Sequence, residues 1–139
     1  MPPTCSPIQS DDIMLLPCSG ACSVGQLSHQ AAVELTTAGF GRMYGLAGIA
    51  AGLAAAITDA GKVRMIVAID GCATACSRQI LEKTGIGCSN HLIITDLGID
   101  REDSLRIKNE DLQLVKDAIQ ACCAEVKPII RLGGCMCGI

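Results

Sequence analysis

Two pairs of cysteines in this chain share one spacing and one setting. Cys18 and Cys22 follow a short apolar run, as do Cys72 and Cys76, and in both places a glycine lies close by and a helical pattern comes next. Thiolates bind soft metal ions, and they also act as nucleophiles in redox reactions. The start of a helix favours the thiolate over the thiol. The repeated spacing therefore predicts either a metal site or a site of thiol chemistry.

The first hypothesis is a thiophilic metal site, with zinc as the expected ion. Four cysteine thiolates are the full tetrahedral set for structural zinc, although sulfur ligands also suit Cu(I) or an iron–sulfur cluster. The C-x-x-x-C spacing lies within the range of zinc ligands but is less specific than paired C-x-x-C motifs. Two tail cysteines that follow a Gly-Gly pair could add ligands or pass an ion to the site. The candidate ligands are Cys18, Cys22, Cys72, Cys76, Cys135 and Cys137.

The second hypothesis is thiol chemistry without a stable metal, such as disulfide exchange or the handling of sulfur or selenium. Cys72 would be the nucleophile, and Cys76 or the Cys135/Cys137 tail would resolve a mixed disulfide. The thioredoxin spacing C-x-x-C is absent. Val24 stands where a Cys-x5-Arg anion loop starting at Cys18 needs arginine. No His–carboxylate–nucleophile pattern is readable, so the sequence names no reaction, and a cysteine-rich core without chemistry is the third alternative.

The ten cysteines also bear on the compartment. The first residues lack the basic and apolar regions of a signal peptide, so we expect a cytoplasmic protein. In a reducing compartment, clustered cysteines more often mean metal or redox chemistry than disulfides.

Four cysteines are left out of the predicted site. Cys5 lies in a proline-rich arm, and Cys88 lies in a loop expected at the amino end of the sheet. Cys122 falls on the apolar stripe of the last helix and is interpreted as a small core residue. Cys123 is about 100° further round that helix, so the two adjacent sulfurs are not expected to face one metal.

Around the cysteine pairs, the chain alternates apolar runs with helical patterns. Runs rich in β-branched residues and bounded by Gly or Pro predict buried strands, and spacings of three and four predict helices. The expected strands are 13–17, 63–69, 91–95 and 128–132, and the expected helices are 24–38, 41–61, 73–84 and 109–126. We therefore expect an α/β fold, a Rossmann-like three-layer sandwich around a mainly parallel sheet of about four strands. Parallel strands would bring the cysteine pairs to one carboxyl edge.

Some polar residues have expected structural roles. Asp70 precedes Gly71-Cys72 and is interpreted as a turn or helix-cap residue that positions Cys72, with direct ligation the lesser possibility. Ser23 and Gln26 could form a capping box at the start of helix 24–38. His29 lies off the apolar stripe of that helix and is expected at the surface, and His91 begins a strand at the end of the sheet away from the site.

Composition excludes several function classes. The net charge is −3 and the aromatic residues are only Phe40 and Tyr44, so neither a phosphate-binding patch nor stacking platforms for nucleic acid are present. The uncharged segment 44–57 is too short to span a membrane and is interpreted as a buried helix. We expect a flexible arm over 1–11 and a single α/β domain over 12–139, with a metal ion as the only partner that the sequence indicates.

The sequence also resembles the DGC-domain family, which takes its name from an Asp-Gly-Cys motif. The resemblance covers roughly residues 13–125. It is carried by segments 17–27, 46–50, 69–72 with Cys76, and 95–98. It implies zinc binding, a property that the family's description draws from potential chelating cysteines. The matching positions are Cys18, Asp70, Cys72 and Cys76, whereas Cys22 matches less closely and the tail cysteines lie outside the pattern.

Overall fold

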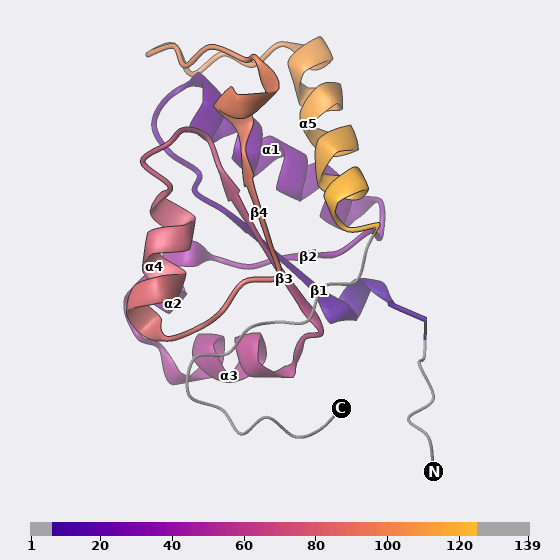
Figure 1. Ribbon diagram of the computed structural model, residues 1–139, viewed down its shortest axis with the longest axis vertical. Coiled ribbons are helices and arrows are strands. Elements are labelled where there is room, and N and C mark those ends of the chain that lie inside the picture. Colours follow the sequence, from indigo (N-terminus) through magenta and orange to yellow (C-terminus); the bar gives the residue numbers. More distant parts are fainter. Residues whose placement is uncertain (1–6, 125–139) are drawn as a thin grey trace.

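Strands and helices alternate along the part of the chain that the computed structural model describes, residues 7–124 (Figure 1). The strands are β1 (Ile13–Pro17), β2 (Arg42–Met43), β3 (Met65–Asp70) and β4 (Asn90–Ile93). The helices are α1 (Ser23–Thr37), α2 (Leu46–Ala50), α3 (Ala54–Lys62), α4 (Cys76–Thr84) and α5 (Asn109–Cys122), with 3-10 turns η1 (Ser10–Asp12) and η2 (Ile94–Leu97). This order confirms the predicted α/β class.

The four strands form one parallel sheet in the order β2-β1-β3-β4. The two central strands are in register along their whole shared length, with Ile13 opposite Met65 and Pro17 opposite Ile69. Because their carboxyl ends are adjacent, the loops that follow them begin side by side.

Helices cover both faces of the sheet, as a three-layer sandwich requires. In Figure 1, α1 and α5 lie on one side of the strands, and α2, α3 and α4 lie on the other. Alternate residues of β1 divide between the two cores: Leu15 packs with Leu27 and Val115, whereas Leu16 packs with Ile49 and Leu81. A strand with two buried faces explains the uninterrupted apolar run in the sequence.

The prediction for segment 41–61 was wrong. In place of one buried helix, the segment contains the edge strand β2 and the short helices α2 and α3. Gly52 has a φ of +73°, a left-handed conformation that ends α2, so the glycine breaks the helical pattern. Within 44–57, Ile49 is buried but Leu53 is 57% exposed. Within residues 7–124, no helix has the length and apolar character needed to cross a bilayer.

Several predictions fall outside the described residues. They concern the strand 128–132 and the cysteines Cys5, Cys135 and Cys137, which all lie within segments 1–6 and 125–139. The division into an arm and one domain stays a prediction.

Candidate functional site

The two cysteine loops meet where β1 and β3 end. The backbone N–H of Cys18 donates a hydrogen bond to the carbonyl of Ile69 (2.9 Å), which extends the pairing of the two strands by one residue. The N–H of Gly71 donates in return to the sulfur of Cys18 (3.4 Å). The sulfur of the first pair therefore lies against the backbone that leads into the second pair.

Gly71 is needed because the second loop presses against the first turn of α1. A Cβ at this position would lie 2.8 Å from the carbonyl carbon of Val24 and 2.9 Å from the nitrogen of Gly25. Gly25 is equally tight, since its Cβ would overlap the backbone of Gly20. The glycine of the Asp-Gly-Cys motif thus allows the two loops to approach at backbone distance.

Neither pair lies on one helical face. Cys76 is the first residue of α4, while Cys72 lies outside the helix, and Ala75 between them has a φ of +51°. In the first loop Cys22 is the N-cap of α1, and Ser19 has a φ of +52°. Left-handed conformations are uncommon for Ser and Ala, so nothing local in the sequence announces these turns. In each pair, one cysteine follows a strand and the other begins a helix.

Asp70 caps α4, as predicted. Its carboxylate is 1% exposed and accepts hydrogen bonds from the backbone N–H groups of Ser77 (2.8 Å) and Arg78 (3.3 Å). These are N–H groups of the first helical turn, which have no partner within the helix. The cap fixes the start of α4 and with it the position of Cys76.

His91 also contacts Asp70, a contact that no local pattern in the sequence predicts. Its Nε2 donates to Oδ2 of Asp70 (2.8 Å), and both side chains are largely buried. β4 pairs only with the last part of β3, so that His91 stands opposite Ala68 on the face that Asp70 shares. The expectation that His91 lies at the far end of the sheet was therefore wrong. It assumed that β4 and β3 begin at the same level, whereas β4 begins opposite Val67, two residues into β3.

The structure brings all four cysteines of the two pairs to one cavity of about 300 Å³. Glycines of both loops, Thr74 and the guanidinium-bearing Arg101 complete its walls. Cys22 is buried and Cys76 is exposed, so the four cysteines differ in their access to solvent. The convergence expected from parallel strands is thus observed for these four positions.

Two of the thiols have shifted acidities. Hydrogen bonds from the side chain and backbone of Thr74 lower the pKa of Cys72, and the charge of Arg101 acts in the same direction. Burial raises the pKa of Cys76, and negative charge at Asp70, Cys18 and Cys72 raises it further. Cys72 is therefore the more readily ionised of the pair.

The fit of a metal ion depends on rotation of these side chains. Within residues 7–124, no three His, Cys, Asp or Glu side chains are grouped closely enough to hold an ion as they stand. Each cysteine has one side-chain torsion with three staggered positions, and each step moves its sulfur. The cavity supplies the right donor atoms, and closing around an ion would require some sulfurs to turn inward.

Cys18 also lines a second cavity. It has a volume of about 450 Å³, and its lining is mainly apolar, with Met43, Tyr44 and Ile80 among its residues. His29 lines it and shares a hydrogen bond with the hydroxyl of Ser19 (3.0 Å between Nδ1 and Oγ). His29 is half-buried and lines this cavity.

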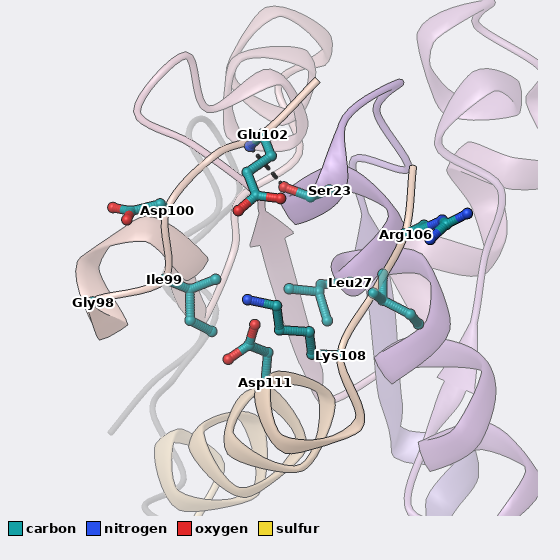
Figure 2. A pocket seen from close by; sticks show the side chains of 10 residues that line it. Ser23, Leu27, Gly98, Ile99, Asp100, Glu102, Arg106, Lys108 and Asp111 are labelled. Carbon is teal, nitrogen blue, oxygen red and sulfur yellow. Dashed lines mark hydrogen bonds between the residues drawn. The ribbon is translucent and has the colours of Figure 1, made fainter. Parts of the chain in front are cut away.

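A polar hollow of about 180 Å³ lies next to the start of α1 (Figure 2). Ser23 does not form the predicted capping box, because its hydroxyl accepts from the N–H of Glu102 (2.8 Å). Its own N–H donates to the carbonyl of Glu102 (2.9 Å). Lys108 and Asp111 lie at the opposite end of the hollow in Figure 2. The Ser23–Glu102 bonds hold the chain beside Arg101 against the cysteine loops.

The remaining described cysteines lie elsewhere. Cys88 precedes β4 and does not line the four-cysteine cavity, and burial raises the pKa of its thiol. At the end of α5, Cys122 is half-buried and Cys123 is buried, the reverse of the predicted arrangement. α5 ends at Cys122, and Cys123, the residue that caps the helix, packs in the same buried cluster as Ile119.

Comparison with known proteins places these features in a family. The family model of the DGC domain matches residues 14–119, which include most of β1, the Asp70-Gly71-Cys72 motif and most of α5. No curated protein and no solved structure matches the chain. Since the matched segment spans more than half of the sequence and contains both cysteine loops, the chain belongs to the DGC-domain family.

Proposed function

We propose that this protein binds a thiophilic metal ion, with zinc as the expected ion, through cysteine thiolates at the carboxyl edge of its sheet. The observation that carries the proposal is the lining of one cavity by Cys18, Cys22, Cys72 and Cys76. Four thiolates make a complete tetrahedral zinc site, with Zn–S bonds of about 2.3 Å. Cys135 and Cys137 remain candidates for further ligands or for delivery of the ion.

Two further observations support this proposal. Burial raises the pKa of Cys76, and negative charge at Asp70, Cys18 and Cys72 raises it further; a bound cation would offset that repulsion. The DGC-domain family is consistent with a cysteine-rich, metal-binding role. The proposal assumes the reducing cytoplasm, where thiols stay free of disulfides.

The test is the metal content of protein purified without oxygen and without added metal. Elemental analysis should find about one zinc per chain, and roughly four thiols should resist modification until a chelator is added. Cys72→Ser should sharply lower the zinc content. Cys88→Ser, the matched control outside the cavity, should leave it unchanged. Equal zinc contents in the two variants would refute the assignment.

A second candidate function is thiol chemistry at Cys72, and one observation favours it. The lowered pKa of Cys72 provides more thiolate at neutral pH than an ordinary cysteine has. Cys76 lines the same cavity and is the candidate thiol for resolving a mixed disulfide. Metal-free protein in which all ten cysteines react would favour this function. Cys76→Ser should then accumulate a mixed disulfide at Cys72 that peptide mass spectrometry can locate.

A further inference from the structure

Arg101 brings a positive charge to the wall of the four-cysteine cavity. The rest of the lining consists of the cysteines, glycines, one alanine and one threonine, so among the described residues Arg101 alone carries a permanent charge into it. Walls without other ions focus the field of a single charge on the space that they enclose. A molecule that reaches Cys72 therefore enters the field of a guanidinium.

The backbone on both sides of Arg101 is anchored. Its neighbour Glu102 exchanges two hydrogen bonds with Ser23, and Ser23 directly follows Cys22 in the chain. On the other side, Ile99 is 8% exposed and packs in the core that α1 covers. The segment that carries Arg101 is thus held against the cysteine loops, although it forms neither helix nor strand.

The acidic neighbours of Arg101 line a different space. Asp100 and Glu102 both line the polar hollow, and Figure 2 shows the carboxylate of Glu102 pointing into it. Arg101 lines the four-cysteine cavity and not this hollow. The segment therefore sends its acidic groups to one side and its guanidinium to the other.

Asp70 is the acidic residue nearest to Cys72 along the chain, and it does not line the cavity. Its buried carboxylate accepts hydrogen bonds from His91 and from the first turn of α4. These donors and the positive end of the helix dipole offset its negative charge. The charge that an entering molecule contacts is therefore that of Arg101.

The guanidinium of Arg101 is available to a further anion. Its ion pair with Asp103 is long (3.5 Å between Nη1 and Oδ1), and both side chains are exposed. Exposed pairs of this kind contribute little free energy, so they are readily exchanged for another partner. The planar fork of N–H donors in a guanidinium matches both oxygens of a carboxylate.

We propose that Arg101 makes the four-cysteine cavity selective for small organic anions, whose carboxylate it binds beside Cys72. The inference rests on the second candidate function, thiol chemistry at Cys72, and names the class of substrate for it. A cavity of about 300 Å³ limits the ligand to a small molecule. Hydrogen bonds from Thr74 lower the pKa of Cys72 and the charge of Arg101 lowers it further, so the guanidinium already acts on this thiol.

The experiment compares two alkylating reagents of similar size, the anion iodoacetate and the neutral iodoacetamide, on reduced full-length protein freed of metal with a chelator. In both reactions the thiolate forms a carbon–sulfur bond and iodide leaves, so the ratio of the two rates cancels the ionised fraction of the thiol. Peptide mass spectrometry gives this ratio at each cysteine. At Cys72, Arg101→Gln should lower the iodoacetate to iodoacetamide ratio by about three- to tenfold, the size expected of one charge beside a water-accessible site.

The controls separate the charge of Arg101 from other effects. Arg101→Lys keeps the charge and should retain most of the preference for iodoacetate. Arg106→Gln, the matched control, removes an exposed charge from the same segment on the side of the polar hollow and should leave the ratio unchanged. Cys88 lies outside the cavity and is the internal reference in every protein. Higher ionic strength should weaken the preference of the unaltered protein.

An unchanged ratio at Cys72 in Arg101→Gln would overturn the proposal, as would an equal fall in Arg106→Gln or a complete loss in Arg101→Lys. Arg101 is exposed, so its replacement should leave the fold intact, and thermal unfolding of each variant checks this. Failure of the thiol function itself has a different signature, the absence of a mixed disulfide at Cys72 in Cys76→Ser.

Discussion

Replacing Gly71 with alanine tests the close contact on which the site depends. The new methyl group would lie 2.8–2.9 Å from backbone atoms of Val24 and Gly25, well inside van der Waals contact. Backbone atoms cannot rotate away as a side chain can, so the first turn of α1 must move. Overpacking of this kind costs about 1–3 kcal/mol of unfolding free energy. For a chain of this length that corresponds to a fall in the melting temperature of roughly 3–10 °C.

The substitution should also alter the cysteine site itself. The N–H of Gly71 donates to the sulfur of Cys18 at 3.4 Å, and separating the two loops lengthens this bond. We therefore expect that in the Gly71→Ala variant Cys18 is alkylated faster, and that the variant retains less zinc than the unaltered protein. Peptide mass spectrometry after brief iodoacetamide treatment reports the first effect, and elemental analysis reports the second.

Gly45→Ala is the matched control. Gly45 precedes α2 with a φ of −76°, which alanine adopts freely, and a Cβ there would meet nothing within 4 Å. Its melting temperature should therefore stay close to that of the unaltered protein. If Gly71→Ala unfolds at the same temperature as Gly45→Ala and labels Cys18 at the same rate, the close packing of the two loops is refuted.

Three other substitutions test single interactions. Thr74→Val removes a side-chain hydrogen bond that lowers the pKa of Cys72. The pH profile of Cys72 alkylation should therefore move to higher pH, and the rate at neutral pH should fall. An unmoved profile would exclude that bond as the cause of the lowered pKa. Asp70→Asn removes the carboxylate that caps α4, and urea unfolding should show a loss of about 1–3 kcal/mol, with no loss contradicting the cap. Ser23→Ala removes the hydroxyl that accepts from Glu102, so hydrogen exchange at the Glu102 amide should become faster, and unchanged exchange would contradict a role for that bond.

The sheet could be predicted because its two central strands carry a strong local signal. The runs that became β1 and β3 are apolar on both faces, and the parallel arrangement then fixed which ends of the strands meet. Segment 41–61 could not be predicted in the same way. Its regular glycine spacing is compatible with a packed helix, yet Gly52 adopts a positive φ and ends one. Spacing alone does not distinguish a glycine that packs from a glycine that turns.

The parts of the site that escaped prediction depend on long-range register. His91 reaches Asp70 only because β4 pairs with the carboxyl-terminal part of β3. No pattern around His91 specifies this register of the two strands. Ser23 has the sequence of a cap, but its hydroxyl pairs with Glu102, which is far along the chain. The gathering of Cys18 and Cys72 was predictable, because it follows from the order of strands and turns alone.

Because each cysteine pair is divided between a strand end and a helix start, an ion bound at the site would connect the sheet with the helices on its two faces. Cys18 and Cys72 follow the two central strands of the sheet, Cys22 caps the helix α1 on one face, and Cys76 begins the helix α4 on the other. An ion held by all four sulfurs would cross-link the three layers at one point. Separating any layer would then break a metal–sulfur bond, so loss of the ion should accelerate global unfolding and not merely loosen a loop.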